Sequence, residues 1–467
     1  MAVRPPAALL VDTRPLRASP AFRRLWIGRG ISGLGAQMTL VAVMYQVWEA
    51  TGSTVWTGAV GLAQAVPLVG LGLPAGAVAD RVDRRRLYLT MAAGQAVCSA
   101  ALAVQGLGGR LPAAGVLGVL AAQSALGAFS GPAAGTFVPR LLPKEHLAAG
   151  LALNRVAFQT QMLAGPALGG LVIGAWGVGG CYLLDALSFT AGLYGAFGLP
   201  PMPPEGEPSR PGLRGVGDGL AFLARTPSVR GALLTDLATM VLSMPISLFP
   251  LVNAERFGGD PRTLGLFTTA VAVGGVLASL LSGAFTRLPR PGLVMLAGSA
   301  GWGVSLTLFG LVTRPWAALG LLAVAGAADT VAVVSRGTIV RLHTPGAMLG
   351  RVGAAEQIVG QAGPDLGNMR AGLVARTSSG TTALVSGGLL CLAAIALVAA
   401  STPGLRGVTG ARPDPAGPDP ADPPAEPMAE PAPPLAVPPS REGAVPPSGT
   451  SPPPARPGPH TAATDGS

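Results

Sequence analysis

Long apolar runs recur along this chain, and they restrict its possible folds more than any other feature. A helix needs about 20 apolar residues to cross the hydrocarbon core of a bilayer. Only 12% of the residues are charged, about half the share in soluble proteins, which argues against an ordinary soluble enzyme. Twelve runs of spanning length lie near residues 25–48, 56–79, 87–107, 113–134, 150–174, 180–199, 229–252, 263–286, 292–312, 316–335, 352–376 and 381–402.

The runs form two groups of six, and this grouping predicts the domain organisation. We expect an N-terminal segment (1–24), a six-helix bundle (25–199), a linker (200–228), a second six-helix bundle (229–402) and a tail (403–467). Proline has no amide donor and fixes its own backbone angle, so the proline-rich tail is expected to be disordered. It would serve as an inert extension or as a recognition segment.

Basic residues gather in alternate loops, which predicts how the chain is oriented. Lysine and arginine near the ends of membrane spans stay on the cytoplasmic side. We therefore expect a multi-pass protein of a bacterial plasma membrane with both termini, the linker and the tail in the cytoplasm. A net charge of +10 spread over these loops does not favour nucleic-acid binding. The clusters lie at Arg14 to Arg24, Arg81 to Arg86, Arg140 and Lys144, Arg210 to Arg225, Arg287 and Arg290, and Arg336 to Arg351.

A short block is repeated in the two halves. Gly165-Pro166-Ala167-Leu168-Gly169-Gly170 in the fifth run matches Gly363-Pro364-Asp365-Leu366-Gly367-Asn368 in the eleventh. Internal repeats are typical of transporters built from two pseudo-symmetric halves. Proline bends a helix and glycine permits close helix packing. Gly165, Pro166, Gly169 and Gly170 are therefore expected to pack against a partner helix, or also to bend the span and shape a cavity.

The loop after the second run reads Gly76-Ala77-Val78-Ala79-Asp80-Arg81-Val82-Asp83-Arg84-Arg85-Arg86. Its spacing resembles the signature loop of the major facilitator superfamily, with Asp83 at a position where many members have glycine. The Gly-Pro-x-x-Gly-Gly block resembles the motif of that superfamily's exporters. The chain is thus identified as a member, which implies an all-α integral membrane protein with the major facilitator fold: twelve transmembrane helices in two pseudo-symmetric six-helix halves.

A narrower resemblance points to the enterobactin exporter branch. It rests on Pro20-Ala21-Phe22-Arg23, on Arg290-Pro291-Gly292-Leu293 and, most specifically, on Thr344-Pro345 followed by Ala347-Met348-Leu349-Gly350-Arg351. The resemblance implies secondary active export of a siderophore by proton antiport and alternating access. A broad-specificity multidrug/proton antiporter of the same fold is the nearest alternative, and a membrane-embedded enzyme or a facilitator is more remote.

The family also implies a cytoplasmic gate formed by Gly76, Asp80, Arg81 and Arg85. Gly76 would let two helices approach, and Asp80 would meet the positive N-terminal end of the eleventh helix, a contact worth up to about 2 kcal/mol. The alternative is that the arginines only fix the topology, which we expect for Arg84.

Ionisable groups inside spans are costly and are usually functional. Asp236, Asp329 and Asp365 are the candidates for proton coupling, because a carboxyl group in a low-dielectric environment can take up and release a proton. In this fold spans one, four, seven and ten line a central cavity, so Asp236 and Asp329 would face it. The alternatives are structural pairing for Asp185 and Asp365, and extension of Arg29 and Glu356 towards water.

Polar and soft residues on the lining spans predict a roomy, weakly polar cavity for a small molecule. The candidates are Arg29, Gln37, Gln123 and Met240, with Met244 beside them, although each could serve packing alone. The sequence has no nucleophile–base set, no metal-ligand spacing and no Walker loop, so we expect no enzyme activity, no metal and no cofactor. The expected partners are the substrate, protons and lipid, with the protein acting as a monomer.

Overall fold

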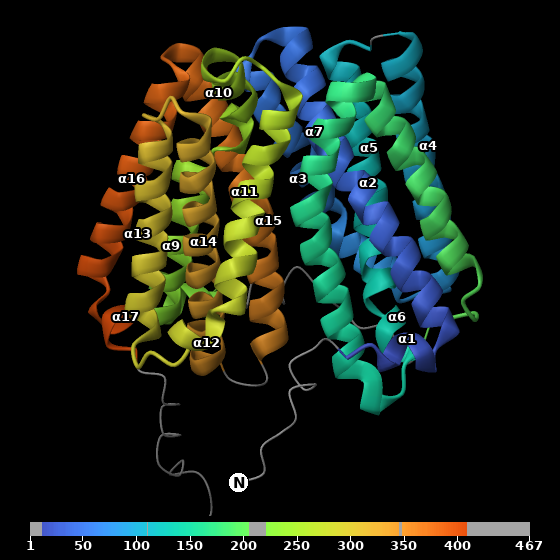
Figure 1. The fold of residues 1–467 in the computed structure, drawn as a ribbon. Helices are drawn as coiled ribbons and strands as arrows, with labels where there is room; N and C mark the ends of the chain where they lie inside the picture. Colours follow the sequence, from blue (N-terminus) through green and yellow to red (C-terminus); the bar gives the residue numbers. More distant parts are fainter. Residues whose placement is uncertain (1–11, 110, 205–220, 345–347, 409–467) are drawn as a thin grey trace, which may run out of the picture. The chain divides into compact units, whose positions relative to one another are not determined.

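A computed structural model describes residues 12–109, 111–204, 221–344 and 348–408, and nearly all of them are helical (Figure 1). The first half comprises α1 (Arg14–Ala18), α2 (Pro20–Thr51), α3 (Thr54–Ala79), α4 (Arg84–Gly108), α5 (Ala113–Gly135), α6 (Phe137–Leu141) and α7 (Lys144–Phe197). The second comprises α9 (Pro227–Ser243), η2 (Ile246–Leu248), α10 (Phe249–Arg256), α11 (Pro261–Leu280), α12 (Ser282–Phe285), α13 (Pro291–Phe309), α14 (Pro315–His343), α15 (Leu349–Thr377), α16 (Gly380–Ser401) and α17 (Pro403–Gly407).

Nine segments of the described chain are long and apolar enough to cross a membrane. One of them, α7, contains both the fifth and the sixth predicted spans. Gly177, with a positive φ of 70°, separates the two helical parts. The chain folds back there, since the Cys181 thiol contacts the Gly169 carbonyl at 3.4 Å. Helices α2 and α15 have 32 and 29 residues and carry more charge. If α7 is counted as two spans and α2 and α15 are added to the nine segments, the structure is consistent with twelve crossings.

The seventh predicted span, 229–252, is not one continuous helix. Helix α9 ends at Ser243, Met244 is extended, and the chain resumes in η2 and α10. The cause is Pro245, because the residue before a proline is disfavoured in the helical conformation. At and after the break, Met244, Pro245, Ile246 and Phe249 line a cavity together with residues of the first half.

The ordered bundle extends further than the sequence predicted. The tail was expected to begin at residue 403, but Pro403–Gly407 form α17. Leu405 is fully buried there and lies against Gly292 of α13. Proline is tolerated at the first position of a helix, where its missing amide donor is not needed, and burial of Leu405 holds this turn in place. Residues 409–467 of the predicted tail lie outside the described residues.

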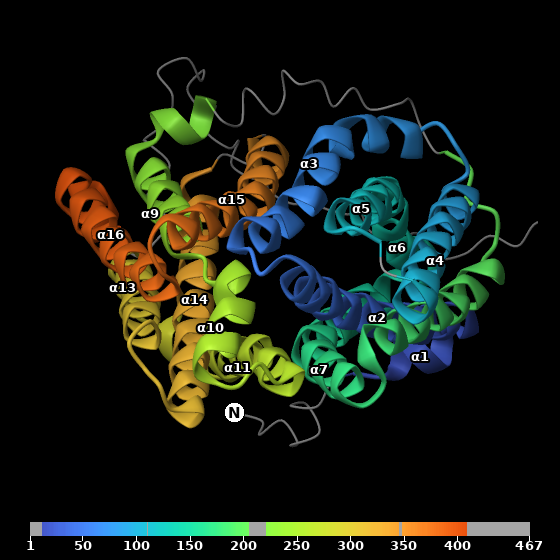
Figure 2. The ribbon, with the colours of Figure 1, turned by 90° about the horizontal axis from the view of Figure 1, so that it is seen from above.

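The two bundles meet along two helix pairs, α3 with α15 and α7 with α11 (Figure 2). The Thr54 hydroxyl donates to the Gly372 carbonyl at 2.7 Å, and the Thr57 hydroxyl donates to the Ser247 carbonyl at 2.8 Å. The Thr269 hydroxyl donates to the Leu163 carbonyl at 3.2 Å. Helix α1 precedes the first end of α2, and α3 begins with Thr54 just after the other end of α2. The Thr54 and Thr57 contacts therefore lie on the side of the molecule opposite α1.

Candidate functional site

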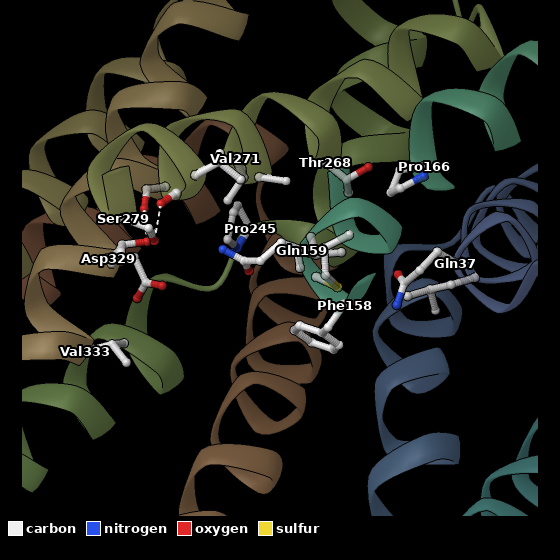
Figure 3. Close-up of a pocket in the computed structure, with 18 of the residues that line it drawn as sticks. Gln37, Phe158, Gln159, Pro166, Pro245, Thr268, Val271, Ser279, Asp329 and Val333 are labelled. Atoms are coloured by element: carbon white, nitrogen blue, oxygen red, sulfur yellow. Dashed lines mark hydrogen bonds between the residues drawn. The ribbon is translucent and has the colours of Figure 1, made fainter. Parts of the chain in front are cut away.

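A cavity of about 360 Å³ lies between the two bundles. Figure 3 shows Gln37 of α2 on one side of it and Asp329 of α14 on the opposite side. The remaining wall is mostly apolar, as is usual for sites that bind small organic molecules. Its aromatic and methionine side chains are Phe158, Phe249, Trp302, Met44, Met162 and Met244.

The helices that line this cavity differ from those expected. Spans one, seven and ten contribute as predicted, but α5, the fourth span, contributes none of the residues that line it. The fifth span, in α7, and the eighth, α11, take part instead. The reason is their close packing: a Cβ at Gly170 would overlap the backbone of Pro261, and a Cβ at Gly265 would overlap that of Pro166. The close crossing of α7 and α11 places one face of each of these two helices at the cavity.

Arg155 and Phe158 of α7 line the cavity, and neither was among the residues predicted to do so. The Arg155 guanidinium carbon lies 5.7 Å from the centre of the Phe158 ring. A helical spacing links Arg155 to Gln159, Met162 and Pro166, all on the same lining face. That spacing was the available signal, because positions four, seven and eleven apart share one side of a helix. Among its described lining residues, the cavity therefore holds one cation, Arg155, and one acid, Asp329, from opposite bundles.

The predicted cavity residues divide between several places. Gln37 lines the central cavity, whereas Arg29 and Gln123 line smaller cavities within the N-terminal bundle. Met240 was expected at the cavity but instead packs against Gly363 and Gly367 of α15. The two glycines allow α9 and α15 to approach closely, and this approach fixes which face of α9 is turned away from the cavity.

The three coupling candidates also differ in position. Asp329 lines the central cavity. Asp365 borders an adjacent cavity of about 370 Å³, and its carboxylate lies against Gly61 of α3 in the other bundle. Asp236 does not face the cavity as predicted, because it is buried and forms an ion pair with Arg336 of α14. Arg336 also lies 3.8 Å from the Glu356 carboxylate, which was expected to extend towards water.

The two repeat blocks make equivalent contacts. Gly165 packs against Gln37 and Gly169 against Met38, both in α2, the first span of its bundle. In the second copy, Gly363 and Gly367 pack against α9, the corresponding span of the other bundle. The close packing predicted for this block is therefore present. Its last position differs, because Asn368 accepts a hydrogen bond from the Ser247 amide at 3.0 Å where Gly170 contacts α11.

The signature loop makes contacts within its own bundle. Asp80 ends α3 and pairs with Arg84 at 3.4 Å, so Arg84 does more than fix topology. Arg85 donates to the Phe197 carbonyl and lies over its ring, whereas Arg81 is exposed. No described atom of a neighbouring segment lies within 4 Å of a Cβ built at Gly76, so the expected close approach is absent here. The contact of Asp80 with the eleventh helix stays a prediction.

Asp83, the departure from the family pattern, has a structural role. Its carboxylate accepts a hydrogen bond from the Arg86 amide at 2.8 Å and so caps the N-terminus of α4. It also accepts from the Met202 amide at 2.7 Å, and the Met202 carbonyl accepts from the Arg84 amide at 3.0 Å. The start of the linker is thus fastened to the signature loop.

Comparisons with known proteins agree with this architecture. A family model described as a transmembrane secretion effector matches residues 12–409. The enterobactin exporter EntS of Escherichia coli O1:K1 / APEC is 30% identical over 405 residues, which cover 83% of this chain and 95% of the relative. The relatives are transporters rather than enzymes.

Two solved structures show the same fold at low sequence identity. A POT family transporter in complex with 5-aminolevulinic acid has a TM-score of 0.67 at 12% identity, covering 83% of this chain and 97% of the other. A bacterial homologue of the human lysosomal transporter Spinster, in an inward-facing and unoccupied conformation, has a TM-score of 0.62 at 14% identity. The alignment covers 84% of this chain and 97% of that homologue.

Proposed function

Since this chain belongs to the transmembrane secretion effector family of the major facilitator superfamily and is a multi-pass efflux transporter, we propose that its cargo is a siderophore of the enterobactin type. The cargo would leave in exchange for protons, by alternating access and through a monomer. The observation that carries this proposal is the central cavity, which both bundles line. The identity with an enterobactin exporter supports the cargo class.

The chemistry of the cavity suits an amphipathic molecule with aromatic rings. Phe158, Phe249 and Trp302 offer ring faces, and Met162 and Met244 offer polarisable thioethers. Aromatic pairs and sulfur–aromatic contacts each contribute about 0.3–1.5 kcal/mol beyond area burial. Polar groups at Gln37, Arg155 and Asp329 would then orient the hydroxyl and carbonyl groups of the cargo.

Asp329 supports proton exchange because the proton and the cargo would compete for the same carboxylate. An ionised carboxylate accepts hydrogen bonds from phenolic hydroxyls through both oxygens, whereas a protonated one has lost part of that capacity. Loading Asp329 with a proton would therefore weaken cargo binding. Asp365 lies in the adjacent cavity and would relay the proton across the boundary between the bundles.

The contacts between the bundles support an assignment of the conformational state. The hydrogen bonds of Thr54 and Thr57 lie on the side opposite α1, and the distribution of basic residues predicts that α1 is cytoplasmic. The structure would then be closed towards the outside of a bacterial plasma membrane, with both termini in the cytoplasm. Export requires these contacts to separate.

A multidrug/proton antiporter remains the second candidate, because the largely apolar wall would accept many amphipathic molecules. The test is transport into inverted membrane vesicles that are energised to be acidic inside, with a catecholate siderophore and a cationic dye offered separately. We expect siderophore uptake that stops when a protonophore collapses the gradient. Uptake of the dye alone would favour the multidrug function, and siderophore uptake that survives the protonophore would contradict antiport.

A further inference from the structure

One acid lies away from the central cavity, inside the N-terminal bundle. Asp185 of α7 is completely buried. The Ser99 hydroxyl of α4 donates to its Oδ2 at 2.7 Å, and the Gln123 amide of α5 donates to Ser99 at 2.9 Å. Three helices therefore contribute to one polar cluster around this carboxyl.

No cation compensates this carboxyl within the residues that the structure describes. The side chains packed around it are Thr39 of α2, Ser99, Gln123 and Ser188, and all are neutral. The nearest titratable groups are Cys181, one turn away on α7, and Tyr182, whose hydroxyl donates to Gln46 instead. The structural pairing expected for Asp185 is therefore absent from the described chain. An uncompensated carboxylate in such a place is strongly unfavourable, and a buried acid normally becomes neutral.

Two oxygen atoms of the cluster are unsatisfied. Asp185 Oδ1 and the Thr39 hydroxyl oxygen are both buried, and neither makes a hydrogen bond of good geometry among the described residues, although Thr39 lies beside the carboxyl. Buried polar atoms without partners are rare and need an explanation. A proton on the carboxyl would remove the buried charge, which no cation offsets among the described residues.

A polar route leads to this cluster. Thr39 and Gln123 line a cavity of about 200 Å³ together with Gln64, Gln95 and Ser124. That cavity shares Gln95 with one that contains Arg29, and it shares Gln64 and Ser124 with the one that contains Asp365. Its polar side chains would support water, which needs two to four polar partners. The cavity that contains Asp365 also shares Met44, Met162 and Met244 with the central cavity, so the polar route adjoins the cargo cavity.

We propose that Asp185 is a second proton-binding site, reached through this polar route and distinct from Asp329, the acid that lines the cargo cavity. A proton delivered by water adds to the carboxylate, which becomes a neutral carboxylic acid; no other bond forms or breaks. The inference rests on the proposed proton exchange and adds a step to it. Occupation of Asp185 would permit α2, α4, α5 and α7 to pack together, and release of the proton would loosen them.

The first test is infrared spectroscopy of the full-length protein in lipid vesicles. The wild-type spectrum is expected to contain a carbonyl band of a buried carboxylic acid that Asp185→Asn removes. The matched control is Tyr182→Phe, which deletes one buried hydrogen bond from the same helix and should keep the band. An unchanged band in Asp185→Asn would overturn the proposal. Loss of the wild-type band on addition of sodium at constant pH would overturn it as well, because the ligand would then be a metal cation.

The second test separates this inference from the proposed function. Inverted vesicles containing wild type, Asp185→Asn and Tyr182→Phe are compared with and without a pH gradient. Stimulation of wild type and Tyr182→Phe, with loss of stimulation in Asp185→Asn, is the expected result. Equal stimulation of all three would contradict the role of Asp185 only. Absence of stimulation in wild type would contradict proton exchange, and the infrared band would still decide whether Asp185 holds a proton.

Discussion

Gly170 of α7 lies directly against Gly265 of α11, and neither position has room for a Cβ. The two glycines belong to different bundles, so their contact is part of the boundary that the proposed alternating access would have to change. Pro261 and Pro166 supply the backbone carbonyls that close on each glycine. Because backbone atoms cannot move aside as a flexible side chain would, the contact does not tolerate a larger residue at either glycine.

Gly170→Ala should therefore disfavour the conformation seen here. Overpacking of this kind costs about 1–3 kcal/mol, which corresponds to a shift of about five- to 150-fold between two states. The measurement is the initial transport rate together with the labelling rate of a cysteine introduced at Thr57, which should increase as the boundary opens.

Gly118→Ala is the matched control, because no described atom of a neighbouring segment lies within 4 Å of the added Cβ. It should transport and label like the parent. If Gly170→Ala behaves in the same way, the contact does not control the boundary.

Asp329→Asn should uncouple transport from the proton gradient. The amide keeps the size of the side chain in the cavity wall but cannot be ionised, so cargo uptake should no longer increase when the gradient is applied. Initial rates with and without a gradient check this. Glu49→Gln, at the exposed end of α2, changes an acid outside the cavity and should keep full stimulation. Retained stimulation in Asp329→Asn would exclude this carboxylate from coupling.

Arg336→Met should destabilise the C-terminal bundle, because it leaves the buried Asp236 carboxylate without its partner. Breaking a buried ion pair from one side costs about 3–5 kcal/mol. The midpoint of thermal unfolding in detergent should fall clearly, whereas the exposed Arg314→Met should change it little. The double variant Asp236→Leu with Arg336→Met should regain most of the loss. A double variant as unstable as the single one would contradict this explanation.

Asp83→Ala should weaken the hydrogen-bonded contact between the signature loop and the linker. Loss of an N-cap costs about 0.5–2 kcal/mol, and the Met202 amide also loses its acceptor. Asp83→Ser keeps a capping hydroxyl and should lose less. Thermal unfolding measures the loss of the helix cap, and proteolysis of the linker measures the loss of the Met202 contact. An Asp83→Ala protein that resists heat and protease as well as the parent would contradict this role of Asp83.

Much of the architecture was predictable because local chemistry fixes it. Runs of spanning length gave the helices, and the repeated Gly-Pro block identified positions of close packing that the structure contains at Gly169 and Gly367. The break at Pro245 was also visible in the sequence. The length of the apolar run outweighed it in the prediction, although proline at that position prevents a continuous helix.

The candidate site was less predictable because it depends on how each helix is rotated about its axis. Asp236 and Met240 lie on one helix and both were expected at the cavity, yet one pairs with Arg336 and the other packs on α15. These contacts follow from the crossing of α9 with two neighbours, which hydropathy does not encode. Likewise, the space beside Gly76 depends on where the neighbouring helices lie, which the loop motif does not specify.

The contact between Thr57 and Ser247 allows the most direct test of alternating access. Cysteines at these two positions, joined by oxidation or by a short thiol-reactive bridge, would hold the bundles together on the side opposite α1. Vesicles with the double variant should show no siderophore uptake when bridged and parent-like uptake after reduction, while each single cysteine variant transports under both conditions. Equal uptake by the bridged and the reduced protein would contradict the account, because cargo would then cross without separation of the two bundles.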